Sequence, residues 1–152
     1  MRLRILSIGR DRSGQFEPLV TDYLARLQRY VPSEAIVVGE AQGEDAAARR
    51  AEATLLRKKL GTTDRFVALD ERGDLLTSAA LAAQFNAEAR RGSKDLTYVL
   101  GGPSGFDPDF LREASWSLAL SRFTLPHQLA RVVLAEQLYR AQTILRGEPY
   151  SK

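Results

Sequence analysis

The amino-acid sequence predicts an α/β domain built on a mainly parallel sheet. Two observations lead to this prediction: short apolar segments alternate with helical patterns along the chain, and several of these segments are apolar at nearly every position. A strand that is apolar on both faces is typical of a parallel sheet covered by helices on each side. With 152 residues, of which 44% are hydrophobic, the chain is long enough for one such domain over residues 1–152.

The first half of the chain predicts three strands and two helices. The strands are expected at three short apolar segments: residues 3–8, 35–38 and 65–69. One helix is expected over residues 16–27, where apolar residues recur at three- and four-residue spacing. The other is expected over residues 44–60, where alanine and charged residues dominate. Gly61 marks the end of the second helix, and residues 70–74 are expected to form a turn.

The second half predicts two more strands and three more helices. The strands are expected at an apolar run and at a segment of strand and loop: residues 96–100 and 118–125. The helices are expected at three segments with suitable first and last residues: residues 77–91, 107–114 and 128–146. Asp107 before Pro108 is typical of a helix start, and Gly147 followed by Pro149 ends the last helix.

The composition favours a soluble, cytoplasmic protein without a metal site. The chain has no cysteine, and its one histidine without a nearby acidic pair makes a poor metal site. No apolar run approaches the roughly 20 residues that a membrane span needs, and the first nine residues do not resemble a secretory signal. The net charge of +3 favours a polyanionic partner, but many unrelated proteins share such a charge.

A glycine-rich segment, Gly-Gly-Pro-Ser-Gly at residues 101–105, directly follows the strand expected over residues 96–100. Three glycines let the backbone turn sharply and approach a ligand, but they would equally suit a tight connection without a ligand. The segment lacks the Lys-Ser or Lys-Thr of a P-loop, and no Gly-x-Ser-x-Gly motif surrounds Ser104. Because ligands bind beyond the carboxyl ends of parallel strands, we expect a site at the loops after Leu69 and Leu100.

Two features of the C-terminal third each allow two interpretations. The last expected helix is apolar around most of its circumference, which suits either the core of the domain or a homodimer interface. His127, the one histidine, is either a buried imidazole with satisfied hydrogen bonds or a functional residue. Neither pattern decides between its two interpretations.

Three ordered segments make this sequence similar to a known family. They are Gly-Gly-Pro-Ser-Gly-Phe, Ser-Arg-Phe-Thr-Leu-Pro-His-Gln and Arg-Val-Val-Leu-Ala-Glu-Gln-Leu-Tyr-Arg-Ala, at residues 101–106, 121–128 and 131–141. Over its whole length the chain resembles the ribosomal RNA large subunit methyltransferase H family of SPOUT methyltransferases. The resemblance implies a SPOUT fold with a C-terminal trefoil knot, which general folding rules would not predict because true knots are rare.

The resemblance also implies an activity and a cofactor pocket. Members of the family are homodimers that use S-adenosylmethionine to methylate N3 of a pseudouridine in 23S ribosomal RNA, acting on assembled 70S ribosomes. The matching positions imply that the pocket is formed by eight residues: Leu69, Gly101, Leu120, Ser121, Arg122, Phe123, Thr124 and Leu125. Backbone groups and apolar side chains suit adenine and the methionine stem, and we expect the leucines and Phe123 to shield the ring from water.

The sequence does not assign the catalytic residues. N3 must lose its proton, so a base or a cation that stabilises the anion would help, and the candidates are His127, Arg131 and Tyr150. Relatives usually carry histidine and a basic residue after the tyrosine, whereas this chain has Ser151 and Lys152, so we expect the tail to position substrate. Two other functions remain open: a non-catalytic ribosome-binding factor on the same scaffold, and an enzyme that uses a different nucleotide cofactor.

Overall fold

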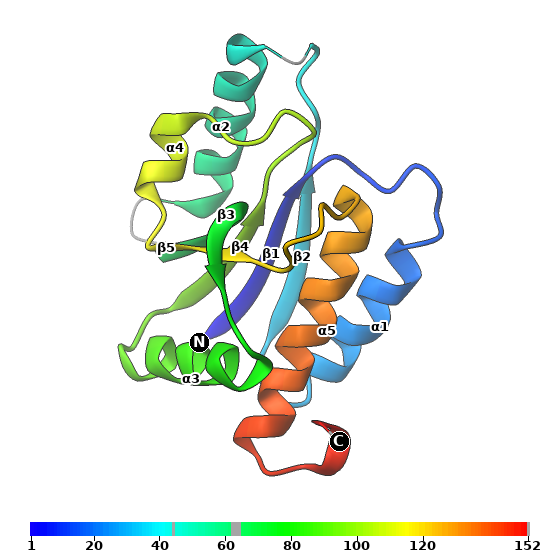
Figure 1. The fold of residues 1–152 in the computed structure, drawn as a ribbon, viewed down its shortest axis with the longest axis vertical. Coiled ribbons are helices and arrows are strands. Elements are labelled where there is room, and N and C mark those ends of the chain that lie inside the picture. Colours follow the sequence, from blue (N-terminus) through cyan, green and yellow to red (C-terminus); the bar gives the residue numbers. More distant parts are fainter. Residues whose placement is uncertain (44, 62–64, 152) are drawn as a thin grey trace.

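The computed structural model describes residues 1–43, 45–61 and 65–151 (Figure 1). The elements in chain order are β1 (Arg2–Ile8), α1 (Glu17–Leu27), β2 (Ser33–Val38), α2 (Ala46–Leu60), β3 (Arg65–Leu75), α3 (Ser78–Arg90), β4 (Asp95–Leu100), α4 (Pro108–Glu113), β5 (Trp116–Ala119), α5 (His127–Leu145) and the 3₁₀ helix η1 (Pro149–Ser151). Every expected helix and strand is present, with ends shifted by a few residues. Glu44, the expected first residue of the second helix, lies outside the described residues.

The strands of the described residues form one parallel sheet of five in the order β2-β1-β4-β3-β5. Side chains alternate between its two faces, so that Leu3 and Ile5 enter one core while Leu6 and Ile8 enter the other. Both faces of β1 are therefore buried, which is why most of its residues are apolar. The prediction of a parallel α/β sheet is confirmed, and the trefoil knot stays a prediction.

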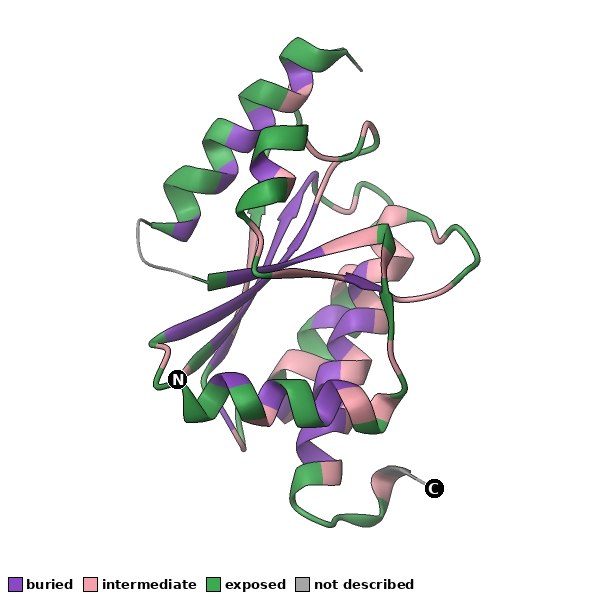
Figure 2. Ribbon diagram, turned by 60° about the vertical axis from the view of Figure 1, so that its left-hand side comes forward, coloured by how far each residue is buried: buried purple, intermediate pink, exposed green. Residues whose placement is uncertain are grey.

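Helices cover both faces of the sheet, with α1, α3 and α5 on one side and α2 and α4 on the other (Figures 1 and 2). On the second side Phe110 of α4 stacks on Phe66 of β3, with ring centroids 4.9 Å apart. On the first side α5 lies between α1 and α3 and is buried along much of its length. No helix in the described part of the chain is long and apolar enough to span a membrane.

The position of α5 settles one question that the sequence left open. Leu134 and Leu138 have no exposed surface and pack in the core with Leu27 of α1 and Phe85 of α3. The helix is apolar around most of its circumference because it touches the sheet and two helices at once. The face that carries Leu134 therefore belongs to the core of its own chain and is not free for a dimer partner.

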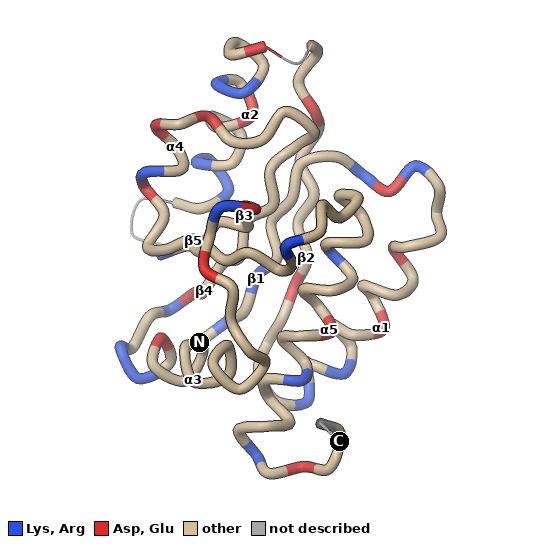
Figure 3. Tube along the Cα trace, viewed as in Figure 1, with Lys and Arg blue, Asp and Glu red and all other residues tan. Residues whose placement is uncertain are grey.

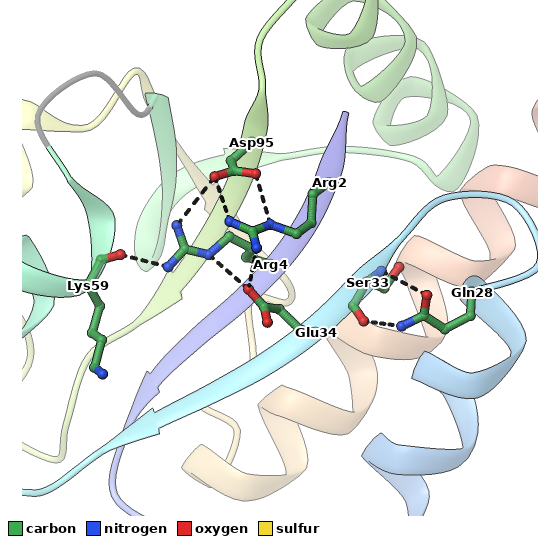
Figure 4. Close-up of polar contacts among 7 residues, drawn as sticks. All are labelled: Arg2, Arg4, Gln28, Ser33, Glu34, Lys59 and Asp95. Carbon is green, nitrogen blue, oxygen red and sulfur yellow. Dashed lines mark hydrogen bonds and ion pairs between the residues drawn. The ribbon is translucent and has the colours of Figure 1, made fainter.

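An ion-pair network joins the amino-terminal ends of the central strands (Figure 4). Arg2 donates two hydrogen bonds of 2.9 Å to Asp95 of β4, and Arg4 pairs with Glu34 of β2 at 3.5 Å. Arg4 also donates to the backbone carbonyl of Lys59 in α2 at 2.6 Å. Because Arg4 and Asp95 are almost completely buried, these bonds are shielded from water and link β1 to both neighbouring strands.

Residues 70–74 do not form the turn that the sequence predicted. β3 continues to Leu75, and its pairing with β5 changes register after Leu69, which produces a bulge. The β5 backbone comes so close that a Cβ atom on Gly73 would lie 2.6 Å from the carbonyl carbon of Ser117. Aspartate and glycine favour a turn locally, but pairing with a strand distant in the sequence keeps this segment extended.

Candidate functional site

A cavity of about 460 Å³ opens at the carboxyl edge of the sheet. Its walls come from the bulge of β3, the loop after β4, the loop between β5 and α5, and the first turn of α5. β4, β3 and β5 are neighbours in the sheet, so the segments that follow them meet at one place. The location is where parallel sheets bind ligands, and the volume is that of a small-molecule site.

Most residues of the expected cofactor pocket line this cavity. Seven of the eight do so: Leu69, Gly101, Leu120, Ser121, Phe123, Thr124 and Leu125. Arg122 is exposed and is not part of the wall. Phe123 is 83% exposed, so its ring lies at the rim and does not form the water-excluding cover that the sequence suggested. The hydroxyl of Ser121 accepts a hydrogen bond of 2.8 Å from the backbone N–H of Phe123, which turns the loop at this point.

The glycine loop after β4 forms the opposite wall. Its N–H at Gly105 donates to the carbonyl of Gly102 at 3.0 Å, and Gly105 has a φ of 79° that favours glycine. A Cβ atom on Gly102 would lie 3.1 Å from side-chain atoms of both Glu52 and Ile8. The missing side chain at this position therefore makes room for α2 and β1, and not for a ligand.

The polar part of the wall comes from the segment after Leu69, where the sequence predicted a site without naming these side chains. Asp70, Glu71 and Arg72 line the cavity because the bulge of β3 carries them along its edge. The Asp70 side chain is 14% exposed, and its carboxylate accepts a hydrogen bond of 3.0 Å from the backbone N–H of Arg72. Their position just after a predicted strand was the signal that indicated this edge of the sheet, although the segment forms a bulge and not the expected turn.

His127 is the catalytic candidate that lines the cavity. The backbone carbonyl of Ile8 accepts a hydrogen bond from its ring, while Nε2 is buried and has no hydrogen-bond partner among the described residues. Burial lowers the pKa of the imidazole below its ordinary value, and the positive charge of Arg131 lowers the pKa further. The ring is therefore neutral near pH 7 and keeps a free lone pair on Nε2.

Arg131, the second catalytic candidate, is completely buried and is not part of the cavity wall. Its Nη1 donates to Glu17 of α1 at 2.6 Å and to the side chain of Gln128 at 2.9 Å. These bonds hold the start of α1 against the first turn of α5. Because its guanidinium lies inside the protein, Arg131 has no exposed surface in this structure, and its catalytic role stays a prediction.

Tyr150, the third candidate, packs on α5 of its own chain, away from the cavity. Its hydroxyl donates to Glu136 at 2.8 Å, its ring meets that of Tyr139 edge-on at 4.7 Å, and Arg140 lies 4.8 Å over it. Glu136 is nine residues after the start of α5, roughly 13 Å along the helix axis. Within one chain Tyr150 therefore does not reach the pocket, and a role of the tail in positioning substrate stays a prediction. Lys152 lies outside the described residues.

The fold and the cavity define an α/β protein with a small-molecule pocket beyond the carboxyl ends of its parallel strands. The model of the family described as predicted SPOUT methyltransferase matches residues 1–151. Ribosomal RNA large subunit methyltransferase H of Anaeromyxobacter sp. (strain K) is 49% identical over the whole of both chains. The protein of that name from Geobacter sp. (strain M21) is 40% identical over 99% of this chain and 98% of its own. The chain therefore belongs to the ribosomal RNA large subunit methyltransferase H family of SPOUT methyltransferases.

Solved structures of a more distant protein are also similar. The SpoU methyltransferase AviRb from Streptomyces viridochromogenes has 14% sequence identity and a TM-score of 0.48, over 96% of this chain. Its complex with the cofactor AdoMet has 13% identity and a TM-score of 0.43, over 97% of this chain. This chain spans 61% of the length of AviRb. Family membership rests on the sequence relatives, because these structural similarities are weak.

SPOUT methyltransferases use S-adenosylmethionine, and the residues of the cavity suit it. Leu69, Leu120 and Leu125 supply apolar surface for adenine and the methionine stem. Asp70 and Glu71 supply carboxylates that can accept hydrogen bonds from ribose hydroxyls or from an ammonium group. No group of three or more potential metal ligands occurs among the described residues.

Proposed function

We propose that this protein is an S-adenosylmethionine-dependent methyltransferase of large-subunit ribosomal RNA. The observation that carries the proposal is the cavity at the sheet edge, whose lining includes seven of the eight positions expected for the cofactor. Full-length relatives at 49% and 40% identity are named for the same substrate. The finer target that we propose is N3 of a pseudouridine in 23S RNA, modified on assembled 70S ribosomes in the cytoplasm.

His127 is the residue to which we assign the substrate proton. S-adenosylmethionine, when bound, supplies the methyl group as part of a sulfonium. The methyl–sulfur bond would break as the bond between N3 of the pseudouridine and the methyl carbon forms, leaving a neutral thioether. The N3–H proton would pass to Nε2 of His127, which is buried, neutral and without a partner among the described residues. The Ile8 carbonyl holds the ring in place, and the buried Arg131 helps to keep it neutral. Alignment of substrate and cofactor in the cavity supplies the remaining rate enhancement.

We also propose that the active form is a homodimer. Part of α5 is not used by the core of its own chain: Leu129, Val132 and Val133 are only partly buried. Such residues can pack against a second copy of the chain. Figure 3 shows that the basic residues are spread along the chain and are not gathered in one region, so we expect substrate recognition to need both subunits.

A methylation assay on ribosomes that lack the modification tests the proposal. With radiolabelled S-adenosylmethionine, we expect label to enter 23S RNA at a single pseudouridine, and calorimetry to show micromolar binding of the cofactor. A protein that binds ribosomes but transfers no label would be a non-catalytic binding factor. A protein that binds a nicotinamide or adenosine phosphate and no S-adenosylmethionine would use another cofactor. Either result would overturn the proposal.

A further inference from the structure

The loop after β1, residues 9–16, lies at the same edge of the sheet as the cavity (Figure 3). β1 and β4 are parallel neighbours, so the loop after β1 starts at the same edge of the sheet as the glycine loop that follows β4. Figure 3 shows the β1 loop projecting outward from the sheet, with a positive, a negative and a positive residue in succession. These residues are Arg10, Asp11 and Arg12. The loop thus brings two cations to the side of the molecule where the cavity opens.

The near end of this loop is bound to the first turn of α5. The side chain of Gln128 donates to the carbonyl of Gly9 at 3.1 Å, and His127 hydrogen-bonds the backbone of Ile8. The N–H of Gly9 donates to Val38 of β2 at 2.8 Å. The same helical turn therefore holds both the start of the loop and the imidazole that lines the cavity, which fixes their relative position.

The far end of the loop is bound to the start of α1. One carboxylate oxygen of Asp11 accepts hydrogen bonds from the N–H groups of Phe16 and Glu17, at 2.8 and 2.9 Å. The other accepts from the hydroxyl and the N–H of Ser13, at 2.7 and 3.2 Å. The Ser13 hydroxyl contributes most to lowering the pKa of Asp11 to about 2, with the Glu17 and Phe16 N–H groups adding to it. Asp11 is thus ionised, and both of its carboxylate oxygens accept hydrogen bonds that fix the shape of the loop.

Arg10 and Arg12 are exposed, and neither side chain takes part in a hydrogen bond or ion pair with the residues that the structure describes. Some other arginines do form ion pairs within the fold: Arg57 pairs with Glu113 at 2.9 Å, and Arg131 pairs with Glu17. The two loop guanidiniums therefore contribute no contact to the fold and are available to a ligand. Guanidinium groups bind phosphate oxygens through paired hydrogen bonds.

We propose that the loop of residues 9–16 is a phosphate-binding arm that holds the backbone of the substrate RNA beside the cavity. This inference rests on the proposed function. Arg10 and Arg12 bind phosphates of the strand that flanks the target base, and the anchors at Ile8 and Gly9 fix these contacts relative to His127. Phosphate contacts of this kind set the position of a nucleic acid without reading its sequence.

Charge reversal at both arginines, R10E/R12E, tests the arm. The matched control is R90E/R91E, which reverses two adjacent exposed arginines at the end of α3, just before β4 and so at the opposite edge of the sheet. With ribosomes that lack the modification, we expect the KM for ribosomes to rise at least about tenfold in R10E/R12E. We expect kcat, S-adenosylmethionine affinity and melting temperature to stay close to wild type, and the control to change KM less than about twofold.

A salt series separates phosphate contacts from other causes. For a fluorescent fragment of 23S RNA, the slope of log Kd against log salt concentration should be lower by about two in R10Q/R12Q than in wild type. Equal Kd values and equal slopes for R10Q/R12Q and wild type would overturn the proposal that the loop binds phosphates. A defect seen on ribosomes but not on protein-free RNA would overturn it as well, because the arginines would then meet a ribosomal protein. Wild type that binds this fragment but methylates no RNA would count against the proposed function alone.

Discussion

Replacing His127 by glutamine should slow methyl transfer by a factor of about 10² to 10⁴, the usual contribution of a general base. Nε2 of this histidine is buried and unpartnered among the described residues, and the lowered pKa keeps the ring neutral near pH 7. Near pH 7 the histidine is in its base form, so the wild-type rate at that pH includes the full contribution of the general base. Glutamine can still donate to the Ile8 carbonyl and place an oxygen in the cavity, but it cannot take up a proton. The loss corresponds to about 3–5 kcal/mol of barrier.

The lowered pKa of His127 sets the direction in which the methylation rate and the stability change with pH. Burial, aided by Arg131, places the pKa of His127 in the folded protein below its ordinary value of 6.5, so the base form dominates above pH 6.5. The rate of wild type should fall on an acid limb below pH 6.5, and this limb should be absent in H127Q. The free energy of unfolding changes in the same direction. As far as His127 is concerned, it has its full value above pH 6.5 and falls as the pH drops through the folded-state pKa, because the unfolded chain binds the proton first.

Single-turnover methylation of unmodified ribosomes, measured between pH 5 and 8, is the appropriate assay, with calorimetry of S-adenosylmethionine as the control. We expect the cofactor affinity of H127Q to stay within about threefold of wild type. A rate reduction of less than about fivefold, or an acid limb that persists in H127Q, would show that the proton goes elsewhere. Loss of cofactor binding in parallel with rate would show that His127 holds the cofactor instead.

Three further substitutions test the packing around the site. Leu134→Ala should lower the free energy of unfolding by about 2–5 kcal/mol in a denaturant titration, without changing the oligomeric state by light scattering, because Leu134 is completely buried in its own chain. Gly102→Ala should lower the free energy of unfolding by about 1–3 kcal/mol in the same titration, since its Cβ atom would crowd Glu52 and Ile8 at 3.1 Å. The same substitution should change cofactor affinity much less than a substitution that faces the cavity. Ser151→His should alter the methylation rate by less than about tenfold, roughly 1.4 kcal/mol, because Ser151 belongs to η1, which packs on α5.

Local patterns in the sequence were enough to predict the sheet and the edge at which the pocket lies, and the resemblance to a family supplied most of the pocket residues. The strands around Leu3 and Val99 are buried on both faces and mostly apolar, and such strands have few stable environments other than a parallel sheet between helices. The glycine segment that ends β4 was found by its composition and position, whereas the pocket residues in the short loop before His127 came from the resemblance to a family. Both lie in the cavity wall because loops that follow neighbouring parallel strands meet at one edge.

Tertiary structure decided which side of each element faces the ligand. Asp70 lies on a cavity wall because β5, more than 40 residues later in the chain, pairs with β3 and forces a bulge where local propensity favoured a turn. Leu134 points into the core, and Arg131 toward Glu17, because α5 is enclosed by α1, α3 and the sheet. Such choices depend on contacts between segments far apart in the sequence, whose free energies outweigh the fraction of a kcal/mol per residue by which local propensities differ.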